Sequence, residues 1–333
     1  MIKTIYIEKS IKNHPRTKKI LKKFPNSTQI LCDQYKEIFN RKKQNFRIQK
    51  SSPSLIIAKK FNNFVLPTPK GLGIGSNKNY YFSHMLNCLY DCRYCFLQGM
   101  YESSNFVLFV NFESFVKSIE KVIKNNLSGE KITFFSGYDC DSLAMESITN
   151  FVKFFLPFFQ EKPNIEIELR TKSVAIKRIL NFEPFDTCII AFSFTPDEIA
   201  RKNEHGVPSV KSRIEAMKKL SNAGWKLGLR LDPIIYHLNY KYNYKKLIDD
   251  IFLKVPEKSF HSISLGAIRF PRKMYNKISN LYPDEKLLSK HFVKENKMIS
   301  YPKNIESEIV SYCKEYLKKY IDENKIFSFD PYL

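Results

Sequence analysis

Three of the seven cysteines, Cys88, Cys92 and Cys95, fall within one eight-residue stretch. Their spacing is C-x3-C-x2-C, and three thiolates spaced in this way can bind three corners of a [4Fe–4S] cluster. The fourth iron is then left without a protein ligand. In chemistry of this kind, S-adenosylmethionine (SAM) chelates that iron. An electron from the reduced cluster then cleaves SAM to a 5′-deoxyadenosyl radical, and the protein supplies binding and orientation.

Zinc is the main alternative for the cysteine motif. His84 lies four residues before Cys88, so a Cys₃His tetrahedral site is conceivable. Zinc modules of that type are small and loop-rich, whereas this motif follows a predicted strand of a larger domain, which favours the cluster. The odd cysteine count argues against a disulfide framework. Cys32, Cys188 and Cys313 are expected to be small buried apolar side chains.

The elements around the motif alternate between strands and helices. Strands are predicted at 79–84, 131–135, 165–169, 187–194, 226–232 and 262–268. Helical spacing marks 112–123 and 210–222, with Ser209 as a cap and Gly224 just past the end. The sequence therefore predicts an α/β fold, a partial (β/α)6 TIM-like barrel with the cysteines after its first strand, at the end where such barrels build active sites.

We expect three regions: a small N-terminal subdomain (1–75), the barrel (76–275) and a C-terminal helical extension (276–333). The first opens with a strand at 4–7, followed by basic helices near 18–24 and 28–41. A strand at 105–110 is expected to decorate the first barrel unit. The glycine-rich segment 70–76 is a poor dinucleotide fingerprint and is predicted to be a loop. One helix face in the extension carries Ile305, Ile309, Cys313, Tyr316 and Tyr320.

Several segments beyond the cysteines resemble the spore photoproduct lyase family of the radical SAM superfamily, and together they cover nearly the whole chain. The matching segments are Tyr94-Cys-Phe-Leu-Gln98 (Y-C-Y-L-Q in the family), Arg170-Thr-Lys172, Phe192-Ser-Phe194 with Arg213-Ile-Glu-Ala216, Ala223-Gly224 through Asp232-Pro-Ile234, and Ile5-Tyr-Ile-Glu8.

The resemblance implies a lyase that reverses a methylene-bridged thymine dimer in DNA. The adenosyl radical abstracts a hydrogen from the lesion, the C–C bridge breaks, and a cysteine thiol returns a hydrogen. The lesion must leave the base stack to reach the radical. Damaged DNA and a low-potential electron donor such as flavodoxin or ferredoxin are the implied partners.

The resemblance also implies how SAM is bound. Lys172 and Ser193 match SAM-contacting positions of the family, and the Lys172 ammonium can pair with the methionyl carboxylate. Ser136 and Gly137 follow the second barrel strand, where radical SAM proteins present backbone groups to the methionine amine.

The hydrogen-return site departs from the family pattern. The family's donor cysteine lies in A-C-T-S-D, where this chain reads Gly137-Tyr138-Asp139-Cys140-Asp141. Tyr138 then stands at the donor position, and Cys140 stands where the family has a SAM-contacting serine. Phe96 replaces the second tyrosine after the cluster, so only Tyr94 remains of that pair. Cys140 and Tyr138 are the candidate donors, and a radical SAM reaction on a different substrate is an alternative.

The formal net charge of +22 suits a polyanion such as DNA, although a Lys- and Asn-rich composition explains it equally well. Together with His84 it leaves a non-catalytic, zinc-bearing nucleic-acid-binding protein as an alternative of another class. No apolar stretch is long enough to span a membrane, and residues 1–8 meet a charge too early for a secretion signal. A cytoplasmic protein is expected.

Overall fold

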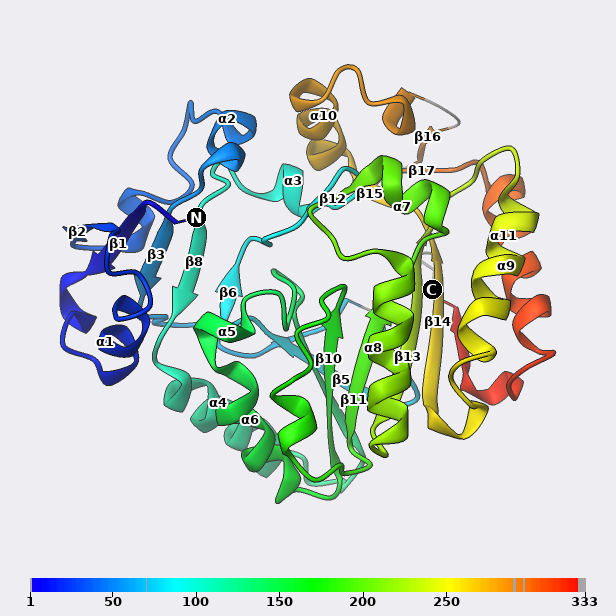
Figure 1. Ribbon diagram of the computed structural model, residues 1–333, viewed down its shortest axis with the longest axis horizontal. Helices are drawn as coiled ribbons and strands as arrows, with labels where there is room; N and C mark the ends of the chain where they lie inside the picture. Colours follow the sequence, from blue (N-terminus) through cyan, green and yellow to red (C-terminus); the bar gives the residue numbers. More distant parts are fainter. Residues whose placement is uncertain (1, 70, 290–291, 296, 329–333) are drawn as a thin grey trace.

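The computed structural model describes residues 2–69, 71–289, 292–295 and 297–328 (Figure 1). Its larger sheet has eight strands in the order β18-β14-β13-β11-β10-β9-β5-β4. Their bounds are β4 Leu66–Pro67, β5 Lys78–Phe82, β9 Ile132–Ser136, β10 Ile165–Thr171, β11 Cys188–Ser193, β13 Lys226–Ile234, β14 Phe260–Ala267 and β18 Ile326–Ser328. All pairs from β5 to β18 are parallel, and β4 alone in this sheet is antiparallel to its neighbour.

The predicted α/β partial barrel is confirmed, because its six predicted strands are β5, β9, β10, β11, β13 and β14 in that order. Helices lie along the outside of this sheet (Figure 1). They are α4 (Phe112–Lys124), α6 (Phe151–Gln160), α8 (Val210–Asn222), α9 (Tyr240–Phe252) and α11 (Lys303–Leu317). As predicted, the Ser209 hydroxyl caps α8 by accepting a hydrogen bond from Ser212 N at 3.1 Å, and Gly224 follows with φ +88°.

A second sheet holds the N-terminal region, drawn in blue on the left of Figure 1. Its order is β2-β1-β3-β8-β6, with bounds β1 Thr4–Glu8, β2 Thr28–Cys32, β3 Leu55–Ala58, β6 Met85–Leu86 and β8 Phe106–Phe109. The helix expected over 28–41 is wrong, since this stretch holds β2 and a 3₁₀ turn at Tyr35–Glu37. Four of the five β2 residues are exposed on the sheet edge, so no buried face gave the strand a readable period.

Strand β8 is the predicted strand at 105–110, but its partners differ from the expectation. It pairs with β3 and β6 and so joins the N-terminal sheet instead of decorating the barrel. All four β3 residues are buried, and a strand buried on both faces needs a neighbour on each side to satisfy its backbone.

The C-terminal region is not only helical. It contains α10 (Arg272–Leu281), a small sheet in the order β15-β17-β16, and helix α11. The small sheet is made of Arg269–Pro271, Met298–Ser300 and Val293–Glu295. The predicted apolar face of α11 buries Ile309 and Cys313, and β18 extends the barrel sheet beside β14. Residues 290–291, 296 and 329–333 of the expected extension lie outside the described residues.

The glycine-rich segment is a loop as far as the structure describes it, since residues 71–76 contain neither helix nor strand. Lys70 lies outside the described residues. Within the ranges described, no helix is both long enough and apolar enough to cross a membrane.

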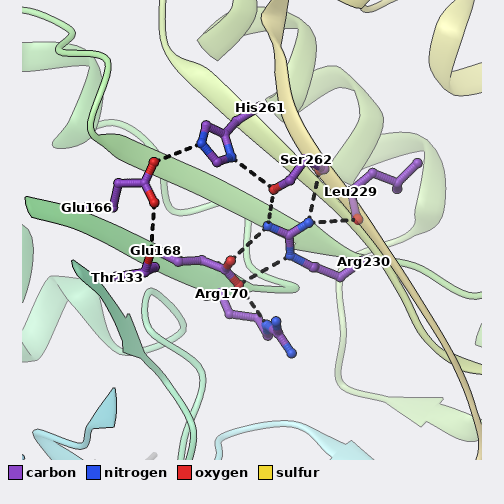
Figure 2. A network of polar contacts seen from close by, with 8 residues as sticks. All are labelled: Thr133, Glu166, Glu168, Arg170, Leu229, Arg230, His261 and Ser262. Atoms are coloured by element: carbon purple, nitrogen blue, oxygen red, sulfur yellow. Dashed lines mark hydrogen bonds and ion pairs between the residues drawn. The ribbon is translucent and has the colours of Figure 1, made fainter. Parts of the chain in front are cut away.

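The inner face of the barrel sheet carries a column of charged side chains (Figure 2). On β10, Ile165, Ile167 and Leu169 pack into the main core, so Glu166, Glu168 and Arg170 point to the opposite face because side chains alternate along a strand. This arrangement replaces the apolar layers that fill a closed barrel.

The centre of the column is an ion pair between Glu168 and Arg230, whose side chains are both 0% exposed. Arg230 Nη2 donates to Glu168 Oε2 and to Ser262 Oγ, both at 2.8 Å. Gly228 provides the space, because a Cβ there would lie 2.6 Å from the same nitrogen. Burial alone would raise the pKa of Glu168, but Arg230 and Arg170 lower it to about 2.

Candidate active site

The cysteine motif lies in the loop between β6 and β8, beyond the carboxyl end of β5. Cys88, Cys92 and Cys95 line one cavity. The Lys50 ammonium braces the loop by donating to the carbonyl oxygens of Cys88 at 2.7 Å and Tyr90 at 3.1 Å. Burial raises the pKa of all three thiols, that of Cys88 to about 12.

This donor set fits an iron–sulfur cluster better than a single zinc ion. Zinc needs all its ligand atoms within about 2.3 Å of one point. Among the described residues, no group of three His, Cys, Asp or Glu side chains is arranged to hold a single metal ion. A cube of four irons instead takes each thiolate at a different corner, so three cysteines that line one cavity are a suitable set.

His84 does not serve the zinc alternative. Its side chain is fully buried, and its ring stacks on Phe151 with centroids 4.2 Å apart and meets the edge of Phe112. Neither ring nitrogen has a hydrogen-bond partner among the described atoms. Burial lowers the pKa of this imidazole to about 3. His84 is therefore a neutral part of an aromatic core.

A buried carboxylate, which the sequence interpretation missed, binds Lys172 and, through Arg213, is linked to the Ser193 carbonyl. Glu204 Oε1 accepts hydrogen bonds from the Tyr94 hydroxyl, from Lys172 Nζ at 3.1 Å and from Thr195 Oγ1 at 2.9 Å. Its Oε2 accepts from Arg213 Nη2 at 2.6 Å. Burial alone would raise the pKa of Glu204, but Lys172 and Arg213 lower it to about 2. No motif marked this residue, which directly follows the short helix α7 (Asp197–Asn203).

The backbone of Glu204 also touches the cysteine loop. The short strand β12 (Glu204–His205) pairs antiparallel with β7 (Asp91–Cys92), and Glu204 stands opposite Cys92. Arg93 N donates to Asn203 O at 2.9 Å next to this pair. Backbone hydrogen bonds thus join the cysteine loop to the segment that carries Glu204, the residue that binds the Lys172 ammonium.

Asp141 links the ends of β9 and β10. Its Oδ2 accepts from Lys172 N at 2.7 Å, and its Oδ1 accepts from Thr171 Oγ1 at 2.6 Å and from the backbone N–H groups of Leu143 and Ala144. Burial raises the pKa of this carboxyl despite those donors. The backbone of Lys172 is therefore held at the same time as its ammonium.

Ser136 and Gly137 form a tight turn at the carboxyl end of β9. Ser136 Oγ lies 2.7 Å from Ser142 Oγ. Gly137 has φ +83°, and a Cβ there would lie 2.5 Å from Ser142 Oγ and 3.1 Å from Arg170 O, so only glycine fits. At the end of β11, the Ser193 carbonyl accepts from Arg213 Nη1 at 2.7 Å. All the expected SAM residues thus lie on the carboxyl edge of the sheet.

The two candidate hydrogen donors occupy different surroundings. The half-buried Tyr138 ring stacks on Tyr81 with centroids 4.4 Å apart and lies 6.0 Å from Phe96. Cys140 is only 6% exposed. Burial raises its pKa, nearby Cys88 adds to the shift, and the backbone of Met85 donates a hydrogen bond to it.

Another buried carboxyl group, that of Asp139, lies between these two candidates in the sequence. Asp139 is 9% exposed. Burial raises its pKa, against hydrogen bonds from Ser83 and Tyr101 and the charge of Lys60. The N-terminal region thus contributes Lys60 to the surroundings of Asp139, the residue before Cys140. Sequence spacing does not reveal this interaction.

Comparison with known proteins decides the family. The family model described as spore photoproduct lyase matches residues 1–330. The chain belongs to the spore photoproduct lyase family. The expected family, its radical SAM lyase chemistry and its cofactors, a [4Fe–4S] cluster and SAM, are thereby confirmed at the family level.

Individual relatives are distant. The spore photoproduct lyase of Bacillus subtilis (strain 168) is 25% identical over 232 residues, 68% of each chain. That of Geobacillus sp. (strain Y412MC61) is 23% identical over 203 residues, 60% of this chain and 59% of the relative. A solved spore photoproduct lyase variant with bound AdoMet and dinucleoside spore photoproduct superposes with a TM-score of 0.84 at 17% identity, covering 99% of this chain and 98% of that one. This similarity supports the fold.

Proposed function

We propose that this protein is a radical SAM lyase that repairs a methylene-bridged thymine dimer in damaged DNA. One observation carries the proposal. In a chain of the spore photoproduct lyase family, three cysteines line one cavity at the carboxyl edge of a half-barrel, next to a Lys172 held by buried groups.

Each group of residues has a distinct task in this proposal. Cys88, Cys92 and Cys95 hold the cluster, which together with SAM supplies a 5′-deoxyadenosyl radical for hydrogen abstraction. Lys172 pairs with the SAM carboxylate. Ser136 and Gly137, at the end of β9, offer backbone groups to the methionine amine. Ser193 completes the SAM site from the end of β11, two strands away in the sheet.

Hydrogen return is assigned to Tyr138. It stands at the family's donor position and stacks on Tyr81 beside Phe96, whereas Cys140 is enclosed. After the C–C bridge breaks, the substrate carbon radical takes the hydrogen atom of the Tyr138 O–H bond. The tyrosyl radical left behind takes one electron and one proton, the electron coming from the reductant. Tyr94, whose hydroxyl donates a hydrogen bond to Glu204, orients the cysteine loop.

The proposed partners are damaged DNA and a low-potential electron donor such as flavodoxin or ferredoxin, in the cytoplasm. The basic composition supports a polyanionic partner. A lesion bound in the duplex must be turned out to reach the barrel edge.

The test uses anaerobically reconstituted protein with SAM, dithionite and dinucleoside spore photoproduct. Restored thymidine and released 5′-deoxyadenosine are expected, and both should be absent for Cys92→Ala. Cleavage of SAM without any repair would instead favour a radical SAM enzyme with another substrate. The replacement of the donor cysteine by Tyr138 is the observation that supports this second candidate.

A further inference from the structure

Glu204 and the two cations that donate to it, Lys172 and Arg213, form a largely buried charge cluster. The side chains of Glu204 and Arg213 are 1% and 0% exposed, and that of Lys172 is 14% exposed. One carboxylate thus faces two cations. The buried Asp141 carboxylate also lies at Lys172, but it accepts from the backbone N–H and not from the ammonium, so the ammonium can still pair with a second anion.

The cluster also shows where that anion belongs. Arg213 is used on the enclosed side, where it donates to Ser193 O and Glu204 and lies over the Phe194 ring, with Cζ 5.0 Å from the centroid. Lys172 is the most exposed of the three charged side chains, and its ammonium donates one hydrogen bond to Glu204. An ammonium has three donors, so the remaining ones are available on the more open side.

Glu204 fixes both the direction of this ammonium and its distance from the thiols. Its carboxylate and the Asp141 carboxylate hold the side chain and the backbone of Lys172, and its own backbone pairs with Cys92. A lysine has four rotatable side-chain bonds, and without such a brace it would lose entropy on binding an anion.

We propose that Glu204 is a positioning residue that aims the Lys172 ammonium at the carboxylate of SAM. This inference rests on the proposed function. It assigns Glu204 no contact with SAM, and its effect passes through Lys172.

The test compares two probes that differ by one group: SAM and decarboxylated SAM, which lacks the carboxylate. Dissociation constants are measured by equilibrium dialysis with the oxidised, cluster-loaded protein, so no turnover is required. The wild type should prefer SAM by well over tenfold, because the carboxylate would both bind the open iron of the cluster and pair with Lys172. Lys172→Ala should lower this preference by about tenfold, the worth of one charge-assisted hydrogen bond, and leave the part due to iron binding.

For Glu204→Gln we expect the preference to fall about tenfold, while the affinity for decarboxylated SAM stays within about twofold of wild type. In the Lys172→Ala background the same change should have no further effect. Thr195→Val, which removes one neutral donor from Glu204, should lower the preference by a smaller factor and serves if Glu204→Gln does not fold. Glu146→Gln is the matched control, because Glu146 is another buried carboxylate with an arginine partner, Arg178 at 3.4 Å, outside this cluster.

A fall in affinity for both probes by the same factor would make Glu204 a merely structural residue and overturn the inference. An unchanged or increased preference for SAM in Glu204→Gln would do the same, and in both cases the proposed function would stand. A wild-type protein that carries the cluster and binds neither probe would refute the proposed function itself.

Discussion

The Tyr138 ring stacks on that of Tyr81, with centroids 4.4 Å apart and planes inclined by 28°. The pair brings together the end of β5 and the turn after β9. Its position next to Phe96 supports the proposal that Tyr138, two residues before the enclosed thiol of Cys140, is the hydrogen donor.

This relationship gives the first prediction. Tyr138→Phe should still cleave SAM but release misquenched dimer products, because the substrate radical no longer meets a donor. Cys140→Ala should give the normal product, and chromatography with mass spectrometry distinguishes the two. The reverse pattern would make Cys140 the donor. If neither variant alters the product, the hydrogen comes from elsewhere and a different substrate becomes the better interpretation.

The second prediction concerns the cluster. Anaerobically purified protein should be brown and contain about four irons per chain, and replacing Cys88, Cys92 or Cys95 by alanine should abolish the colour. Cys188→Ala is the control, since Cys188 is buried in the core strand β11 and should leave the iron content unchanged. Colourless protein with one zinc per chain would contradict the assignment.

The third prediction tests whether the positive net charge contacts DNA phosphates or only reflects the amino-acid composition. If the +22 charge contacts phosphates, the affinity for duplex DNA should fall steeply with salt, by a factor of about 10³ or more between 50 and 200 mM if six or more phosphates are neutralised. Fluorescence anisotropy with a labelled duplex measures it. An affinity that hardly changes over this range would assign the charge to amino-acid usage.

The fourth prediction follows from the Glu168–Arg230 pair. The pKa of Glu168 is lowered from 4.5 to about 2 in the folded protein, so its ionised form stabilises the fold above pH 4.5, and this stabilisation is lost as the pH falls toward 2. At pH 7 it amounts to on the order of 3 kcal/mol.

Urea unfolding of cluster-free protein tests this expectation. Glu168→Gln should be less stable than wild type by about 3–5 kcal/mol at pH 7, since Arg230 is left buried without its partner, and the difference should shrink below pH 4.5. A difference that is independent of pH would show that Glu168 contributes through shape alone.

The barrel and the cysteine site were predictable from sequence because both depend on local patterns. Buried parallel strands give short apolar runs, and Cys88, Cys92 and Cys95 lie within one loop. The edge strand β2 was missed because four of its five residues are exposed. Glu204 was missed for another reason: its partners Tyr94, Lys172 and Arg213 are far apart in the chain, and only the fold brings them to one carboxylate.

Strand β8 pairs antiparallel with β6, so the chain enters and leaves the cysteine loop through two hydrogen-bonded neighbours in the N-terminal sheet. Ordinary backbone pairing, with no contribution from iron, holds the two ends of this loop together. We therefore expect the chain to fold before iron is bound and the cluster to be inserted into the folded protein. Oxygen damage that strips the iron should be repairable by reinsertion, with no need to unfold the chain and start again.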